Sequence, residues 1–229
     1  MKAAVLYEPN TPLVIEEIST RKPKPREVLI RTAVSGLCHS DLHFIEGLYP
    51  HPLPMVLGHE ASGIVEQVGD EVSYLQPGDH VITCLSVFCG TCENCTAGRP
   101  VICTNTDVKL PPGQADRLQW QKSAQLHTGM NLSAFAEQML VHENAVVKIR
   151  KDMPLDRAAL IGCSIITGFG AVSNTAKVAP GVSPFAKPFG PSLMSRSLNQ
   201  TALRPAVNCQ AGSDLKQCHR QGKLARRVQ

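Results

Sequence analysis

Four cysteines lie in one short stretch of the sequence with the spacing of a metal site. Two gaps of two residues are followed by one gap of seven, which places the thiols at Cys89, Cys92, Cys95 and Cys103. Short gaps let neighbouring thiolates converge on one ion about 2.3 Å from each sulfur, and the fourth thiolate completes a tetrahedral shell. Because that shell has no open position for a reactant, the pattern predicts a structural zinc site.

The same cysteines could instead pair as disulfides, but disulfides require an oxidising compartment. The sequence starts at Met1 without a charged and then apolar leader, and this start favours a cytoplasmic chain whose thiols stay reduced. The sequence contains no run of about 18 apolar residues, the length of a membrane span. We therefore expect a zinc site in a cytoplasmic protein that has no membrane segment.

A second group of chemically active residues is spread along the chain. Cys38 opens the hexapeptide Cys38-His39-Ser40-Asp41-Leu42-His43, the pair His59-Glu60 follows 21 residues after Cys38, and Cys163 stands much later. A single Cys or His in an apolar setting more often packs in a core than binds a metal. These residues can therefore form a metal site only if the fold brings them together.

The segments that could do so are mostly strands followed by helices. β-branched and apolar runs bounded by Pro, Gly and Asp predict strands in 1–18 (as a hairpin), 28–34, 63–69, 81–82, 134–141 and 145–149. Residues 104–131 are polar and without a clear period, which predicts a long surface loop. Residues 154–160 and 161–176 predict helices that follow the strands.

The composition separates the last part of the chain from the rest. The 229 residues are 43% hydrophobic and carry a net charge of +4, enough for one large or two smaller globular domains. Residues 182–229 hold eight Lys or Arg and one Asp, so the positive charge belongs to this tail and does not indicate a nucleic-acid surface. The tail lacks a sustained period and could hold a short helix or two, but its composition favours disorder.

Taken together, these motifs resemble the zinc-dependent medium-chain alcohol dehydrogenases. The resemblance covers Met1 to about Gly181 and rests on Gly58-His59-Glu60, the four-cysteine lobe, Pro77-Gly78-Asp79-His80-Val81 and the segment around Cys163. It implies a mainly β fold with some helix: a GroES-like β-barrel catalytic domain in 1–153, the helical start of a cofactor-binding domain in 154–181 and an irregular tail in 182–229.

The resemblance also implies roles for single residues. Cys38, His59 and Cys163 would bind a catalytic zinc ion, whose fourth position takes water or the alcohol oxygen. Ser40 would receive the alcohol proton and His43 would pass it on, while Asp41 and Glu60 would orient the ligands. The remaining assignments are His39 at the cofactor pyrophosphate, Thr167 at the nicotinamide and Leu85 in the wall of the alcohol pocket.

The sequence departs from that family after Gly181. The family continues there with a strand and a Gly-rich turn that binds the NAD pyrophosphate, whereas Val182-Ser183-Pro184-Phe185 begins no such strand. The short motif Gly168-Phe169-Gly170 has no strand before it and is interpreted as helix packing. We therefore expect the nucleotide-binding domain to be missing, with a shifted reading frame or a premature end as the hypothesis.

The expected function is oxidation of an alcohol to an aldehyde or ketone with NAD and two zinc ions per chain, and with little activity in this chain because of the missing domain. A non-enzymatic alternative is a zinc-stabilised module that binds a partner. A third is oxidation of the formaldehyde adduct of glutathione, because the stretch from Cys103 to Ala134 is as long as in that branch. The family forms homo-oligomers; the particular alcohol and the choice of NAD or NADP stay open.

Overall fold

The computed structural model describes residues 1–111, 117–122 and 125–181. Met1–Ala176 forms one compact unit, and the second unit, Lys177–Gln229, is described only as far as Gly181. The disorder predicted for residues 182–229 lies outside the described residues. The account below therefore concerns the first unit.

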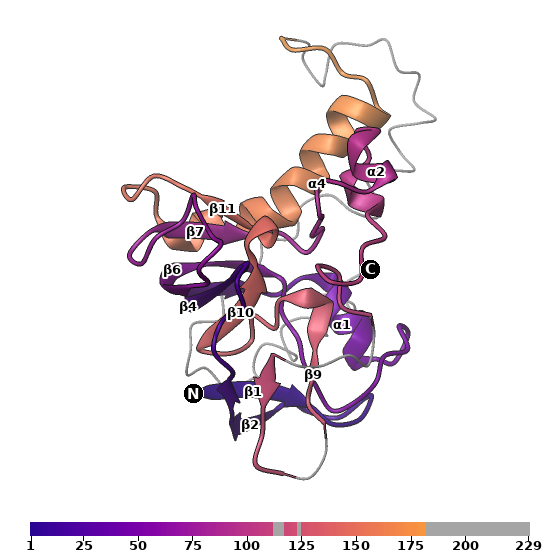
Figure 1. Cartoon of the computed structure of the whole chain (residues 1–229). Helices are drawn as coiled ribbons and strands as arrows, with labels where there is room; N and C mark the ends of the chain where they lie inside the picture. Colours follow the sequence, from indigo (N-terminus) through magenta and orange to yellow (C-terminus); the bar gives the residue numbers. More distant parts are fainter. Residues whose placement is uncertain (112–116, 123–124, 182–229) are drawn as a thin grey trace, which may run out of the picture. The chain divides into compact units, whose positions relative to one another are not determined.

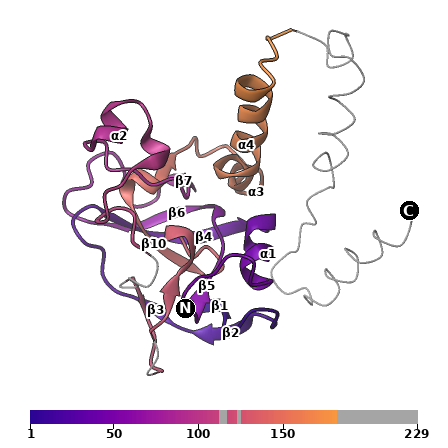
Figure 2. The same cartoon turned by 90° about the vertical axis from the view of Figure 1, so that its right-hand side faces the viewer.

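The strands that the structure describes in this unit form three sheets. Their orders are β2-β1-β5-β9, β10-β4-β6-β7-β11 and β3-β8. The bounds are β1 Lys2–Leu6, β2 Val14–Glu17, β3 Ser19–Thr20, β4 Glu27–Gly36, β5 Met55–Val56, β6 Glu60–Val68, β7 His80–Thr83, β8 Leu118–Gln119, β9 His127–Thr128, β10 Gln138–His142 and β11 Val146–Lys148. Figure 1 and Figure 2 both show β1 and β2 below β4 and β6.

The predicted hairpin and the two long central strands are confirmed. β1 pairs antiparallel with β2, and β4 pairs antiparallel with β6 from Val28 opposite Val68 to Gly36 opposite Glu60. Both long strands begin with four buried residues and become partly exposed toward their ends. The strand predicted for 134–141 begins later than expected, at Gln138. Ser133 has a positive φ of 60°, and Ala136 forms only an isolated bridge with Ala3.

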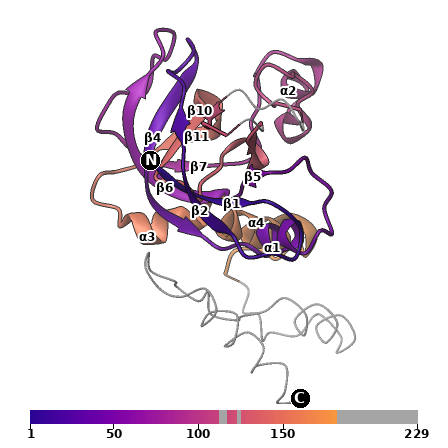
Figure 3. The ribbon, with the colours of Figure 1, turned by 90° about the horizontal axis from the view of Figure 1, so that it is seen from below.

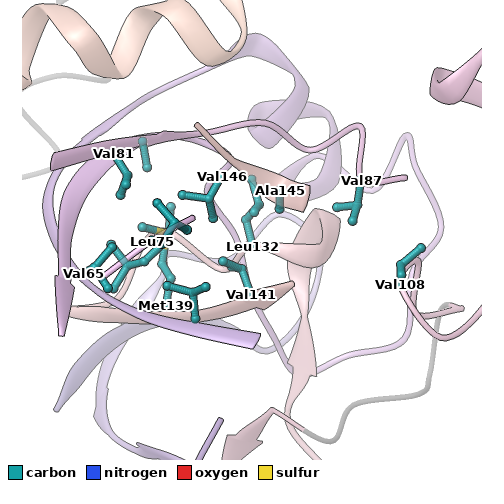
Figure 4. Close-up of a cluster of buried hydrophobic side chains, with 14 of the residues drawn as sticks. Val65, Leu75, Val81, Val87, Val108, Leu132, Met139, Val141, Ala145 and Val146 are labelled. Atoms are coloured by element: carbon teal, nitrogen blue, oxygen red, sulfur yellow. The ribbon is translucent and has the colours of Figure 1, made fainter. Parts of the chain in front are cut away.

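The main hydrophobic core lies between the strands of the five-stranded sheet and the cysteine lobe. In Figure 4 the side chains of Val65, Val81, Met139 and Val141 point toward one another. The same cluster includes Cys89 and Cys103, both nearly buried. The cysteine lobe is therefore joined to the main core by its own ligand residues, although its short helix α2 (Glu93–Thr96) lies to one side of the sheets (Figures 2 and 3).

The helices are short, and the predicted C-terminal helices are interrupted at one residue. Their bounds are α1 His39–Ile45, η1 Pro100–Ile102, η2 Gly129–Asn131, η3 Glu143–Ala145, α3 Leu155–Ala158, η4 Ala159–Gly162, α4 Ser164–Gly170 and the π-helical η5 Ala171–Thr175. Cys163 has φ −137° and ψ −75°, which separates η4 from α4. Among the described residues no single helix is long and apolar enough to cross a membrane, and only the pair 155–162 and 164–175, bent by 48°, passes that test together.

The prediction of a surface loop for residues 104–131 is wrong in part. The described residues of this stretch include β8, β9 and η2, and Arg117, Leu118, Leu126 and His127 are buried. Strands of two residues leave no period in the sequence, and each pairs with a segment far away in the chain: β8 with β3 and β9 with β5.

Candidate metal centres

The four cysteines of the lobe lie at the separations that a zinc ion requires. The distances between sulfur atoms are 3.5 Å for Cys92 and Cys95, 3.9 Å for Cys89 and Cys95, and 3.9 Å for Cys92 and Cys103. All four sulfurs lie within 4.8 Å of one another. A tetrahedron with zinc–sulfur bonds of about 2.3 Å has edges of about 3.8 Å, so the four thiols fit one ion.

Backbone amides turn toward these sulfurs. The amides of Thr91 and Cys92 donate to Cys89 Sγ at 3.4 and 3.3 Å, and the amide of Cys89 donates to Cys103 Sγ at 3.4 Å. Gly90 allows this turn because its φ is +84°, which other residues rarely adopt. The hydroxyl and amide of Thr91 lower the pKa of Cys89 to about 6. These donors favour thiolate, the form that binds zinc.

Three residues of the second group also meet at one point. Cys38 Sγ lies 3.8 Å from Cys163 Sγ, and one ring nitrogen of His59 lies within 4.8 Å of both sulfurs. His59 is 1% exposed, and its Nε2 atom has no hydrogen-bond partner among the described residues. A buried imidazole nitrogen without a partner is costly unless something binds it. Two thiols and one imidazole can supply three of the four ligands of a zinc ion, which leaves its fourth position for a reactant.

The three ligands come from the ends of three different elements. Cys38 precedes α1, His59 precedes β6, and Cys163 occupies the break between η4 and α4. Residues at element ends can point side chains out of the regular pattern of helix or strand. The central sheet fixes two of them, because Gly36 at the end of β4 lies opposite Glu60 at the start of β6.

Asp41 ties two of the ligands together. Its Oδ1 accepts from the amide of Gly58 at 3.1 Å and from Nδ1 of His59 at 3.3 Å, and its Oδ2 accepts from the amide of Cys38 at 3.3 Å. Because Oδ1 of Asp41 accepts from Nδ1, the neutral form of His59 carries its proton on Nδ1 and offers the lone pair of Nε2 to a metal. Asp41 is 2% exposed.

The electrostatics of this group favour a cation at its centre. The neighbouring imidazole of His59 lowers the pKa of Cys38 to about 7. Burial opposes protonation of His59, but Asp41 and Cys38 outweigh it and raise its pKa to about 10. A metal that binds Nε2 therefore displaces a proton from that nitrogen, as metal binding to imidazole requires. Burial, and after it the sulfur of Cys38, raises the pKa of Cys163 to about 12. Negative charge crowds this point, and a divalent cation would relieve it.

Glu60 holds the third ligand in place. Its Oε1 accepts from the amide of Ser164 at 3.1 Å and from the Ser164 hydroxyl at 2.5 Å, and Ser164 is the residue next to Cys163. A methyl group on Gly36 would lie 2.7 Å from Oε2 of Glu60, so the glycine leaves room for the carboxylate. Sequence reasoning missed Ser164, since its contact with Glu60 spans 104 positions.

The helix α1 carries the three remaining polar residues of the hexapeptide. Ser40 Oγ lies 3.7 Å from Cys38 Sγ, at the metal group. His43 lies one turn further along α1, its ring packs edge-on against His39 at 4.6 Å and Tyr49 at 5.0 Å, and its Nδ1 is buried without a partner among the described residues. His39 itself is exposed.

Neither the Thr167 hydroxyl nor the Leu85 side chain has a contact with the three metal-group side chains that assigns it a role in the described structure. Thr167 is exposed on α4, one helical turn after Cys163, whose carbonyl accepts from its amide at 2.9 Å. Leu85 is partly buried and packs against the main core. The described residues around these two side chains carry no further contact that assigns them a role.

Comparison with known proteins places this geometry in a family. Residues 24–151, more than half of the chain, match the family model "Alcohol dehydrogenase GroES-like domain". The chain is 42% identical over 185 residues to an alcohol dehydrogenase class-3 of Pisum sativum, and 42% identical over 187 residues to one of Zea mays. Each match covers 79% of this chain and 49% of the relative, so the chain spans about half the length of these curated relatives.

Solved structures agree with that match. An alcohol dehydrogenase zinc-binding domain protein from Burkholderia ambifaria has a TM-score of 0.72 and 39% identity, over 80% of this chain and 50% of that one. A benzyl alcohol dehydrogenase from Acinetobacter calcoaceticus has a TM-score of 0.69 and 37% identity, over 80% and 50%. The resemblance and the mainly β, GroES-like fold expected from the motifs are confirmed. With its four-cysteine cluster and its Cys-His-Cys group, the chain belongs to the zinc-dependent alcohol dehydrogenase family and carries its GroES-like domain.

Proposed function

We propose that this chain supplies the zinc-binding half of an enzyme that oxidises an alcohol to an aldehyde or ketone, with NAD as hydride acceptor. The observation that carries the proposal is the buried, unpartnered Nε2 of His59 beside the sulfurs of Cys38 and Cys163. A three-ligand site leaves room for a reactant, unlike the four-thiol site of the lobe. We assign the catalytic zinc to this group and a structural zinc to Cys89, Cys92, Cys95 and Cys103, two ions per chain.

Zinc, when bound, supplies the positive charge that allows an alcohol to lose its proton near neutral pH. The residues of the chain prepare the site for this. Asp41 fixes the proton of His59 on Nδ1 and keeps the Cys38 amide in place. Glu60 holds Ser164, and through it Cys163, against the sheet. We assign both carboxylates the role of orienting ligands and adjusting the local charge.

We assign the departing proton to Ser40 and then to His43. Ser40 lies at the metal group, and His43 lies three residues later on α1, on the same side of the helix. The unpartnered Nδ1 of His43 is consistent with a partner from outside the chain, and we propose the cofactor ribose. His39 is assigned to the pyrophosphate, Thr167 to the nicotinamide and Leu85 to an apolar wall of the alcohol pocket.

The domain roles follow from this assignment. We propose residues 1–153 as the catalytic domain and 154–181 as the start of the cofactor-binding part. Residues 182–229 contain no Gly-rich fingerprint for a nucleotide, so we expect these 229 residues alone to bind NAD poorly and to turn over little alcohol. Homo-oligomers, as in the family, are correspondingly doubtful for the isolated chain.

Zinc content per chain is the first test. We expect about two zinc ions by elemental analysis of the purified chain, and one in the Cys163→Ser variant. A wild-type chain that holds one ion, unchanged by Cys163→Ser, would refute the catalytic site and leave only the structural one. The thiols of the described residues are free, which agrees with metal binding and with the cytoplasmic location that we propose.

Activity and cofactor binding form the second test. NADH formation that depends on alcohol and stands well above a Cys38→Ser control would refute the expected inactivity. Equilibrium binding of NAD to the chain separates an enzyme with a weak cofactor site from a module that binds zinc alone. The same assay with NADP decides which nicotinamide the chain prefers.

A second candidate reaction is oxidation of S-hydroxymethylglutathione, the adduct of formaldehyde and glutathione. It is favoured by the long stretch between Cys103 and Ala134 and by the 42% identity to two proteins named alcohol dehydrogenase class-3. The test compares simple alcohols with formaldehyde plus glutathione as substrates. A preference for the adduct by tenfold or more in kcat/KM would select this candidate.

A third candidate is a non-enzymatic, zinc-stabilised module. Four large apolar side chains on α4 and η5 are half or more exposed: Ile165, Ile166, Phe169 and Val172. A patch of this kind favours aggregation or a borrowed partner. A chain that holds zinc, binds no NAD and stays soluble only with a partner protein would support this reading over the enzymatic ones.

A further inference from the structure

A buried arginine connects two distant parts of the chain. Arg117 is 1% exposed; its Nε donates to Oε1 of Glu27 at 3.1 Å and its Nη1 donates to the carbonyl of Asn131 at 3.1 Å. Glu27 also accepts from Nη2 of Arg21 at 2.9 Å and from the amide of Lys24 at 2.9 Å. A buried guanidinium needs such partners. These bonds define what we call the Arg117 clamp.

The clamp ends on a turn that the backbone does not favour. Met130, Asn131 and Ser133 have φ values of 48°, 63° and 60°, in the left-handed region that residues other than glycine seldom adopt. Such a turn persists only where its surroundings hold it. Here the carbonyl of Asn131 accepts from Arg117, its Oδ1 accepts from the amide of Leu110 at 3.1 Å, and the Ser133 hydroxyl accepts from the amide of Gly129 at 3.1 Å.

The residues of this turn and those next to it lie against the backbone that leads into His59. The amides of Ala134 and Phe135 donate to the carbonyls of Gly58 and Leu57, both at 2.9 Å. On the same side, a methyl group on Gly129 would lie 2.4 Å from the carbonyl oxygen of Val56, so the two backbones touch. A displacement of the turn therefore moves Leu57 and Gly58, and His59 follows directly.

We infer that Arg117 is a positioning residue for the three-ligand metal group: it holds the 129–133 turn, the turn holds Gly58, and Gly58 presents His59 to Cys38 and Cys163. The inference rests on the proposed function in one respect, namely that zinc binds these three residues. In this arrangement the turn positions His59 through the residues that precede it, Leu57 and Gly58. Strand β4 positions it from the other side, by pairing with β6, which begins at Glu60.

The test is zinc affinity of each site in the full chain, measured by competition with a chelator, with Cys163→Ser identifying the component of the three-ligand site. We expect Arg117→Met to weaken zinc at that site about tenfold, the lower end of the range for residues that support metal ligands, and to leave the four-cysteine site unchanged. The absorption spectrum of the cobalt-substituted chain should change for the three-ligand site alone, which a general loss of stability would not produce.

Two further variants separate positioning from stability. Met130→Gly removes the cost of the left-handed φ, so the double variant Arg117→Met/Met130→Gly should regain zinc affinity without regaining the clamp. Arg21→Met also removes a partner of Glu27 and serves as the matched control; it should leave zinc affinity within twofold of wild type. If Arg117→Met fails to fold, Arg117→Lys takes its place, because one ammonium group replaces the fork that reaches both Glu27 and Asn131.

Four results would overturn the inference. Unchanged zinc affinity of the three-ligand site in a folded Arg117 variant would overturn this inference but not the proposed function. Equal loss of zinc affinity at both sites, or an equal loss in Arg21→Met, would do the same. A wild-type chain that binds zinc only at the four cysteines would overturn both this inference and the proposed function. The two failures are therefore distinguished within one experiment.

Discussion

Replacing Asp41 by asparagine should separate the metal group from the fold that surrounds it. The change keeps the size of the side chain and one oxygen, which can still accept from the amide of Gly58 and from His59 Nδ1. The variant loses the negative charge. In the wild-type chain the backbone amide of Cys38 donates to Oδ2 of Asp41 at 3.3 Å, and in the variant it would face the side-chain NH2 group of the asparagine. Two donors then face each other in a place that is 2% exposed.

The size of the effect follows from these bonds. An unsatisfied buried amide costs about 1–3 kcal/mol, and a bond to a neutral acceptor is worth about 1 kcal/mol less than one to a carboxylate. The loss at Cys38 and the weakening at Gly58 and His59 therefore sum to about 3–5 kcal/mol. Part of this free-energy cost lowers the stability of the fold. The rest weakens zinc binding, and we expect the zinc affinity of the three-ligand site to fall about 10- to 100-fold.

The assay is chelator competition for zinc, beside urea unfolding followed by the fluorescence of Trp120, the single tryptophan. Asp79→Asn is the matched control, because Asp79 is also 2% exposed, accepts from the amide of Gln76 at 3.0 Å and pairs with Lys148 at 2.8 Å. We expect Asp79→Asn to cost stability while the zinc affinity of both sites stays constant. Equal zinc loss in the two variants, or zinc affinity within twofold of wild type in Asp41→Asn, would refute the reasoning.

Three other changes have clear outcomes. Cys103→Ser should remove one zinc ion per chain and lower the melting temperature by about 5 °C or more in calorimetry, since this thiol also belongs to the main core. Gly58→Ala should cost about 3 kcal/mol in urea unfolding, because φ is +94° and the methyl group would meet the Phe135 ring at 2.5 Å and the Phe135 amide nitrogen at 2.6 Å; Phe135→Leu should not rescue it. Burial lowers the pKa of His142 to about 4. The unfolded chain therefore binds a proton between about pH 6.5 and 4 that the folded chain does not. The free energy of unfolding therefore falls by up to about 3 kcal/mol as the pH drops from 6.5 to 4, and this term has no effect above pH 6.5. His142→Asn should flatten that part of a stability–pH curve.

The parts of the site that the sequence predicted are those encoded by nearby residues or by strong patterns. The four cysteines lie within 15 positions, so their spacing alone nearly fixes their geometry, and the apolar runs of β4 and β6 fix the central sheet. The meeting of Cys38, His59 and Cys163 came only from resemblance to a family. Their sequence separations are too large for spacing to predict a common point.

The missed parts depend on contacts between distant polar residues. Arg117 stands in a polar stretch with no period, and its burial depends on Glu27, 90 positions away, and on the carbonyl of Asn131. Ser164 reads as an ordinary helix residue until its bonds to Glu60 are seen. A buried charge is tolerated only if a partner lies next to it in the fold. A single sequence does not show which distant residue is that partner.

The two metal centres therefore differ in what must be folded before they can bind. The four-cysteine site needs one turn at Gly90, the short helix α2 and local amides, so zinc can organise it together with its own stretch of chain. The three-ligand site needs the central sheet, Asp41 and the bond from Glu60 to the residue beside Cys163. Any perturbation that loosens α4 should release zinc from the three-ligand site first. The structural ion should then leave only with the core to which Cys89 and Cys103 belong.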